Sequence, residues 1–361
     1  MTTYKTLTFT TAIPVLQRYI TADQPILLLG NPGIGKSALA GDIAKLVELA
    51  LEVVISSTCD PTDIGGFPVV RSHDDDKHSF FSRIPMRAIR RAAERPTLLL
   101  LDELTTPPPA VQATLLQGIY ARQFGDVRLH PDSRIMAAAN PVEQAPGGYE
   151  LSAPLVGRFG IYWFEPTMKE FQEYLERLGD EGSDLRMVAA DLSGTLEAKP
   201  DLLQMTPPKA SITDAAKWAS PRDWERALRV WSAGDPDIDD NTLHALLAGS
   251  VGEHAAAGFV GIRKLRVHLP TVSDIKADPN RARLPSETAY QIGSLGLLAQ
   301  VAQEDSWPAW AYTVRLSSPE IRAAAGRMLL RRPLPDSSKW QSDGRKARTK
   351  ILSEVGADLA A

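Results

Sequence analysis

The sequence predicts an α/β fold with a parallel sheet, followed by two mostly helical regions. Apolar runs that are typical of buried strands alternate with stretches of helical spacing, and this order favours parallel pairing. Two of these runs lead into sequences suited to phosphate or metal chemistry: Ile26–Leu29 into a glycine-rich loop, and Leu98–Leu101 into Asp102 and Glu103. Beyond the core, helical patterns predominate. We therefore expect an α/β core at 1–165, a helical lid at 166–262 and a mostly helical C-terminal extension at 263–361.

The composition is that of an ordinary globular protein. The chain has 361 residues, 43% of them hydrophobic, and a net charge of −4. Cys59 is the single cysteine, which excludes an intramolecular disulfide framework and a cysteine-based zinc cluster. No apolar run approaches the roughly 20 residues that span a bilayer, and the first residues lack the order of a secretion signal. We therefore expect a cytoplasmic protein that does not enter a membrane.

A glycine-rich loop follows the first apolar run, Ile26–Leu29. Its sequence fits the pattern G-x-x-x-x-G-K-S, and a helical stretch begins directly afterwards. Backbone N–H groups of such a loop, with the positive end of the next helix, converge on one anion. Lys36 would reach the β- and γ-phosphates of ATP, and the Ser37 hydroxyl would ligate Mg²⁺. The predicted nucleotide-binding residues are Gly30, Asn31, Pro32, Gly33, Ile34, Gly35, Lys36, Ser37 and Ala38.

Two other interpretations of this loop are disfavoured. A plain strand-to-helix connection would not require the complete eight-residue pattern in this context. A dinucleotide fingerprint would place a third glycine where Ala38 stands, and it would have no use for Lys36 and Ser37. The loop is therefore predicted to bind a triphosphate.

An acidic pair ends the second apolar run, Leu98–Leu101. Asp102 and Glu103 follow it, and the carboxyl ends of parallel strands form the edge at which ligands bind. We interpret Asp102 as a residue that organises Mg²⁺ through water, and Glu103 as the residue that orients and polarises the attacking water. The alternative is an exposed pair that caps the turn into the next helix.

The other expected elements of the core come from apolar spacing and turn residues. Asn140 ends the expected strand Arg134–Asn140, a position at which asparagine is more often a turn residue than a catalytic one. Between the second and third strands, Asp63–Ile84 is predicted to form a protruding hairpin or loop. Its aromatic residues Phe67, Phe80 and Phe81 would either grip a client or pack onto the core. The expected elements are a helix within 6–24, the helix Ala38–Leu51, the strand Glu52–Ser56, the helices Pro85–Glu94 and Pro108–Tyr120, and the strands Arg134–Asn140 and Ile161–Phe164.

Helical stripes mark the lid and the extension. The tail Lys339–Lys350 is basic, and residues 263–361 carry 16 Lys and Arg against 10 Asp and Glu, which suggests a separate module. The tail is predicted to be a solvated or partner-docking helix in preference to a nucleic-acid contact, because no nucleic-acid fold signature lies beside it. The expected helical segments are Phe171–Leu178, Asp223–Trp231, Thr242–Phe259, Ser286–Gln303, Pro308–Leu316 and Glu320–Arg332.

Five motifs in a fixed order resemble the AAA+ ATPases. The chain is similar to the MoxR branch of that family, close to the AAA_5 type, at Asp60–Gly66, at Leu151–Phe159 and at Ala219–Arg222. The resemblance covers roughly residues 8–260; the first two motifs are highly specific, and the other three are specific only in that order. The five are Gly30–Ser37 (Walker A), Leu98–Glu103 (Walker B), Ala139–Pro141 (sensor 1), Gly157–Phe159 (arginine finger) and Ser220–Arg222 (sensor 2).

The resemblance implies roles for three further residues. Asn140 would hold the attacking water or the γ-phosphate, Arg158 would reach the nucleotide of a neighbouring subunit, and Arg222 would contact the nucleotide of its own subunit. A guanidinium supplied across a subunit boundary implies a ring, usually a homo-hexamer. Relatives of the MoxR type act as chaperone-like remodellers of protein clients, often with a partner that carries a von Willebrand factor A domain.

The sequence therefore leaves three functions to be tested. The leading one is an ATPase motor that hydrolyses ATP to ADP and phosphate and remodels a protein client. A second is a nucleic-acid-linked motor, such as a translocase or the motor of a defence or restriction system, with nucleic acid as a less favoured partner. A third is a scaffold that binds ATP without turning it over, against which the intact Glu103 and Asn140 argue.

Overall fold

The computed structural model describes residues 4–72, 79–144, 147–207, 217–285 and 287–355. Contacts divide the chain into two compact units. The first unit consists of Met1–Thr167 and Met205–Ile212, and the second of Met168–Gln204 and Thr213–Ala361. The three-domain division at 165 and 262 stays a prediction.

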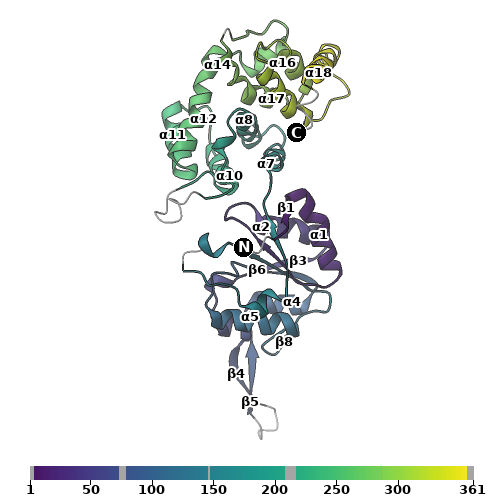
Figure 1. Ribbon diagram of the computed structural model, residues 1–361, viewed down its shortest axis with the longest axis vertical. Helices are drawn as coiled ribbons and strands as arrows, with labels where there is room; N and C mark the ends of the chain where they lie inside the picture. The colour runs from purple at the N-terminus through teal and green to yellow at the C-terminus, as the bar shows by residue number, and fades with distance from the viewer. Residues whose placement is uncertain (1–3, 73–78, 145–146, 208–216, 286, 356–361) are drawn as a thin grey trace. The chain divides into compact units, whose positions relative to one another are not determined.

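A six-stranded parallel sheet forms the centre of the first unit (Figure 1), as the sequence predicts. All neighbouring strands in this sheet run in the same direction. Their carboxyl ends therefore lie at one edge and their amino ends at the other. In spatial order the strands are β1 (Thr6–Leu7), β10 (Gly160–Phe164), β2 (Ile26–Leu29), β9 (Arg134–Ala139), β6 (Thr97–Asp102) and β3 (Ala50–Ile55).

Helices cover both faces of this sheet. Leu98 and Leu100 of β6 pack in the same apolar cluster as α1 (Phe9–Thr21) and α2 (Lys36–Leu46). The alternate residues Leu99 and Leu101 pack in the cluster that contains α4 (Arg87–Glu94) and α5 (Pro109–Ala121). This arrangement explains why the strand is apolar at every position. Short elements complete the unit: η1 (Ser56–Thr58), α3 (Pro61–Gly65), β7 (Gln123–Phe124), β8 (Val127–Arg128), η2 (Val142–Gln144) and α6 (Ala153–Val156).

The helix after the glycine-rich loop is shorter than predicted. It ends at Leu46 rather than Leu51, and β3 begins at Ala50 rather than Glu52. Glu48 has a φ of 56°, a left-handed conformation that a continuing helix does not contain. The chain therefore turns here, and the last residues of the predicted helix join the sheet.

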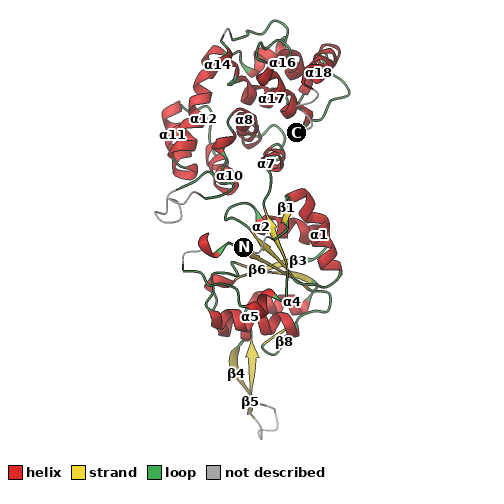
Figure 2. Cartoon of the chain, viewed as in Figure 1, coloured by secondary structure: helices red, strands yellow, loops and turns green. Residues whose placement is uncertain are grey.

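A β-hairpin projects from the first unit (Figure 2). It consists of β4 (Phe67–Ser72) and β5 (Ser79–Ile84), paired antiparallel, and the connecting turn lies outside the described residues. The Phe67 side chain is 65% exposed and that of Phe81 is 73% exposed. Core packing of Phe81 is therefore wrong, whereas the side chain of Phe80 lies outside the described part.

The second unit is helical in its described part. The helix predicted over Thr242–Phe259 is two helices, because Gly252 has a φ of 86° and a Cβ there would lie 2.9 Å from the Lys217 carbonyl oxygen. The helix predicted over 286–303 is likewise interrupted. The elements are α7 (Met168–Leu175), α8 (Asp184–Ala198), η3 (Pro200–Leu202), α10 (Pro221–Trp231), α11 (Asp240–Val251), α12 (Glu253–Lys264), η4 (Leu265–His268), α13 (Val272–Ala277), α14 (Thr288–Gln291), α15 (Ser294–Val301), α16 (Ser306–Thr313), α17 (Pro319–Leu330) and α18 (Gln341–Val355).

Buried ion pairs join helices from both sides of residue 262 within this second unit. The guanidinium of Arg331, which follows α17, lies 3.4 Å from the Glu176 carboxylate and 2.7 Å from that of Glu197. Arg332 is 7% exposed, and burial lowers its pKa although the nearby Glu176 opposes that shift. Among the described residues, no helix is both long and apolar enough to cross a bilayer.

Candidate functional site

The glycine-rich loop connects β2 to α2 at the carboxyl edge of the sheet. Gly33 and Gly35 have φ values of 79° and 96°, which L side chains rarely adopt. A Cβ on Gly30 would lie 2.5 Å from the carbonyl oxygen of Phe164 in β10, so that position also requires glycine. The three glycines therefore let the loop curl tightly against the neighbouring strand.

Lys36 joins the loop to the end of β9. Its Nζ donates to the Gly30 carbonyl at 2.6 Å, to the Asn31 carbonyl at 2.8 Å and to Asn140 Oδ1 at 2.8 Å. The Lys36 side chain is 7% exposed, so these contacts fix the ammonium group in place. Thr105 Oγ1 donates to the Asn140 backbone carbonyl at 2.8 Å and so holds the backbone of Asn140. The structure thus places Lys36 beside Asn140, residues 104 positions apart.

Ser37 and Asp102 form a second contact at this edge. Ser37 Oγ donates to Asp102 Oδ2 at 2.6 Å, and the Glu103 backbone N–H donates to Asp102 Oδ1 at 2.9 Å. A hydroxyl and a carboxylate side by side are oxygen ligands that suit Mg²⁺, which usually takes only one or two protein carboxylates and completes its shell with phosphate and water. The described residues contain no cluster of three or more His, Cys, Asp or Glu side chains that could hold a metal by themselves. The donor set therefore fits a magnesium ion that is bound together with a phosphate.

Glu103 has an unusual backbone conformation. Its φ is 58°, which is uncommon for a residue other than glycine and is often found at functional sites. Ser57 Oγ donates a hydrogen bond to the Glu103 carboxylate. This carboxylate is thus held by a hydroxyl from the end of the neighbouring strand β3.

Two contacts at this edge involve residues that the sequence did not single out. One is Ser57, which stands in a run of three hydroxyl residues after a strand, a weak signal for a polar edge. The other is the segment at Met205 and Thr206. Asn31 Nδ2 donates to the Met205 carbonyl and to Thr206 Oγ1, both at 2.9 Å, and no sequence pattern indicates it.

Arg158 lies at the opposite edge of the sheet from the loop. It precedes β10, whose first residue Gly160 pairs with Ile26 at the start of β2 and donates to the Pro25 carbonyl at 3.0 Å. The four residues of β2 rise about 13 Å before the loop begins. The exposed Arg158 guanidinium stacks over the Tyr120 ring, 4.2 Å from its centroid. Arg158 is therefore separated from the loop of its own chain.

Arg222 belongs to the second unit. It lies on the first turn of α10 and is exposed, while Ser220 caps that helix by accepting from the Asp223 backbone N–H at 3.2 Å. The structure brings together Lys36, Ser37, Asp102, Glu103 and Asn140. It does not bring Arg158 to them, and Arg222 belongs to the second unit.

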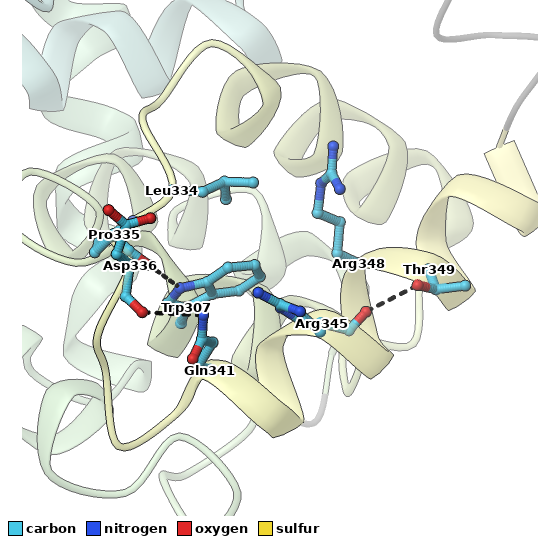
Figure 3. A pocket seen from close by; sticks show the side chains of 8 residues that line it. All are labelled: Trp307, Leu334, Pro335, Asp336, Gln341, Arg345, Arg348 and Thr349. Carbon is cyan, nitrogen blue, oxygen red and sulfur yellow. Dashed lines mark hydrogen bonds between the residues drawn. The ribbon is translucent and has the colours of Figure 1, made fainter.

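A cavity of about 380 Å³ also lies in the second unit, beside α18 (Figure 3). The Arg345 side chain lies next to the Trp307 indole in it, with the guanidinium 6.0 Å from the ring centroid. Asp336 is the carboxylate among the lining residues. The predicted basic tail is thus a helix that lines a cavity. None of the predicted site residues lines this cavity.

Part of the first unit matches a known family model. Residues 25–159 match the family model of the AAA domain of the dynein-related subfamily. This range contains the glycine-rich loop, Asp102, Glu103, Asn140 and Arg158. With the parallel sheet described above, the match shows an AAA+ P-loop NTPase fold.

Solved structures resemble the chain only distantly. NtrX from Brucella abortus is 17% identical over 65% of this chain and 54% of its own, with a TM-score of 0.37. A mutant RuvB from Thermotoga maritima is 19% identical over 69% of this chain and 81% of its own, also with a TM-score of 0.37. A putative ATPase from Cytophaga hutchinsonii is 17% identical over 97% and 90%, with a TM-score of 0.36. The chain spans about half the length of the matched NtrX structure.

Proposed function

We propose that this chain is an ATP-hydrolysing AAA+ motor of the MoxR type, which assembles into a ring and remodels a protein client. The convergence at the carboxyl edge of the sheet carries this proposal. Ser37 lies 2.6 Å from Asp102, and Lys36 lies 2.8 Å from Asn140, although each pair is more than sixty residues apart. Phosphate-binding, metal-binding and water-positioning groups therefore share one small region.

The residues divide the chemistry of ATP hydrolysis among themselves. Lys36 binds the β- and γ-phosphates, and the loop N–H groups bind the remaining phosphate oxygens. Ser37 and Asp102 would hold Mg²⁺, which when bound neutralises charge on the phosphates. Glu103 orients a water molecule toward the γ-phosphorus and accepts its proton, with Asn140 as a second hydrogen-bond partner. The bond from the γ-phosphorus to the β–γ bridging oxygen breaks, and ADP and phosphate leave.

The position of Arg158 supports the proposed ring assembly. Charge builds up on the γ-phosphoryl oxygens during transfer, and a guanidinium can hydrogen-bond two of them. Arg158 lies at the sheet edge opposite its own loop, so in this proposal a second copy presents it to the nucleotide, which supports a closed ring, usually of six subunits. Arg222 is the proposed contact to the nucleotide of its own subunit.

The proposed client is a protein, with a von Willebrand factor A domain protein as a partner. The exposed apolar residues of the β4–β5 hairpin support a protein client, because such side chains bind other apolar surfaces. A nucleic-acid-linked motor and a nucleotide-gated scaffold are the alternatives that the experiments below separate.

A Glu103→Gln variant tests the enzymatic proposal. The amide has nearly the same shape as the carboxylate but accepts no proton, so phosphate release should fall at least about 100-fold while nucleotide affinity stays the same. Phosphate release is measured by a coupled assay and affinity by a fluorescent nucleotide. The unchanged chain is then assayed with candidate client protein and with DNA and RNA. Normal phosphate release from Glu103→Gln would refute the role of Glu103, and stimulation by nucleic acid alone would favour the nucleic-acid motor.

A further inference from the structure

A depression of about 510 Å³ lies at the amino edge of the sheet, beside Arg158. Arg18, in the last turn of α1, also lines it. Both arginines are exposed, so two guanidinium groups from distant parts of the chain border the same hollow. No sequence motif joins Arg18 to Arg158.

Packing fixes the end of α1 against the start of β10. A Cβ on Gly160 would lie 2.3 Å from a ring carbon of Tyr19, so the tyrosine ring rests directly on the backbone of that glycine. The Tyr19 hydroxyl lies 3.3 Å from the Tyr162 hydroxyl, and the two rings meet edge to face. Arg18 therefore stands on a rigid helix whose position relative to Arg158 is set by close contact.

The charge of this hollow is not neutralised within the described part of the chain. Neither Arg18 nor Arg158 forms an ion pair there. The nearby acid Asp23 is already engaged, because Arg122 lies 2.6 Å and Arg134 3.8 Å from its carboxylate. Two cationic groups are thus available to an anion that comes from outside.

We propose that Arg18 is a second cation which, together with Arg158, binds the phosphates of the nucleotide held by a second copy of this chain. The inference rests on the proposed function and deepens it. The opposite edge of the neighbouring copy presents its glycine-rich loop with Asp102 and Glu103, and a bound triphosphate adds further negative charge. An arginine pair suits this partner because a guanidinium donates two parallel hydrogen bonds to phosphate oxygens.

The experiment compares Arg18→Ala, Arg18→Gln and Arg158→Ala with Arg87→Ala, an exposed arginine of α4 as a matched control. All four are assayed for phosphate release at concentrations where particle size shows that the ring forms. We expect Arg18→Ala and Arg18→Gln to lose about 10- to 100-fold in turnover, the size of one charged hydrogen-bonded contact. Nucleotide affinity should change little, because the negative charge on the γ-phosphoryl oxygens that Arg18 contacts builds up during transfer. The Arg87→Ala control should release phosphate at nearly the rate of the unchanged chain.

Mixing separates a role in the neighbouring copy from a structural role. Arg18→Ala subunits mixed with Glu103→Gln subunits should recover part of the lost activity, because the second kind supplies Arg18 to nucleotides bound by the first. Recovery with Arg158→Ala subunits but none with Arg18→Ala subunits would mean that Arg18 acts inside its own chain, which overturns the inference. The Arg18→Gln variant keeps much of the side chain but lacks its charge. If Arg18→Ala does not form rings, the turnover of Arg18→Gln rings tests the inference instead.

Failure of this inference and failure of the proposed function give different results. If Arg158→Ala is impaired while both Arg18 variants form rings and turn over ATP at the normal rate, the role of Arg18 alone is overturned. If Arg158→Ala is fully active in assembled rings, the arginine supplied from a neighbour is refuted as a whole.

Discussion

The ammonium group of Lys36 is held by three acceptors, two of them backbone carbonyls of its own loop. In the proposed function, this cation binds the phosphates together with the loop N–H groups, so its charge would contribute mainly to nucleotide binding. In the proposed mechanism, Glu103 instead acts on the attacking water. The two residues therefore affect different measured quantities, although they lie at the same edge.

Lys36→Ala should abolish measurable nucleotide binding, with an affinity at least about 100-fold weaker, since a charged contact to phosphate is lost and Asn140 loses its partner. The measurement is equilibrium binding of a fluorescent nucleotide. Lys45→Ala, an exposed lysine near the end of the same helix, is the matched control. Affinity within a few-fold of the unchanged chain would contradict the phosphate-binding role.

Motif spacing predicts that Lys36, Ser37 and Asp102 belong to one phosphate and metal site, because the glycine-rich loop and the acidic pair each have a complete pattern; the contacts of Lys36 with Asn140 and of Ser37 with Asp102 come from the structure. Ser57 could not be found in that way. A serine after a strand is common, and its bond to Glu103 exists only because β3 and β6 are neighbours, with Ile55 opposite Asp102. That pairing is a long-range property of the sheet, which no local spacing contains.

At the scale of elements, the β4–β5 hairpin combines a rigid base with an apolar surface. A Cβ on Gly66 or on Gly125 would come within 2.8 Å of backbone atoms of Arg83, so both glycines allow a close approach at the base. The Arg83 backbone N–H donates to Asp126 Oδ2 at 2.6 Å. Farther out, Val70 and Phe81 are cross-strand partners and both are exposed. The hairpin therefore offers the proposed client an apolar surface on a closely packed base.

Phe67→Ala and Phe81→Ala should leave basal phosphate release unchanged and reduce stimulation by a protein client several-fold, because each removes apolar area from the hairpin and none from the phosphate edge. Val267→Ala, another highly exposed apolar residue but in the second unit, is the control. Full client stimulation in the double variant would show that the hairpin does not contact the client.

Element prediction succeeded where buried runs are strongly apolar and failed where one residue sets the backbone. The four residues of β2 lie in the sheet over the predicted range because an apolar run between a turn and a glycine-rich loop has few alternatives. The break between α11 and α12 was missed because helix-favouring residues stand on both sides of it, Leu and Ala in α11 and Ala in α12. Gly252 interrupts them through its positive φ, and the need for that conformation arises from the nearby Lys217 backbone.

At the scale of the whole molecule, the parallel sheet assigns the two halves of the proposed catalytic site to opposite edges. Arg158→Ala should keep nucleotide binding but lose about 10³- to 10⁵-fold in turnover, as expected for an arginine supplied from a neighbour. Arg158→Ala subunits mixed with Glu103→Gln subunits should recover activity in part, and recovery should rise with protein concentration. Phosphate release and particle size are measured on the same samples. Full activity of Arg158→Ala alone, in assembled rings, would exclude the role.

The separation of Arg158 from the loop of its own chain also has a genetic meaning. In the proposed ring, in a cell that makes equal amounts of intact and altered subunits, either single substitution would leave about half of the subunit boundaries competent. An allele with both Glu103→Gln and Arg158→Ala would leave about one boundary in four, since two intact subunits must then be neighbours. A subunit with one substitution inactivates one of its two boundaries, whereas a subunit with both substitutions inactivates both. The double allele should therefore be more strongly dominant than either single one.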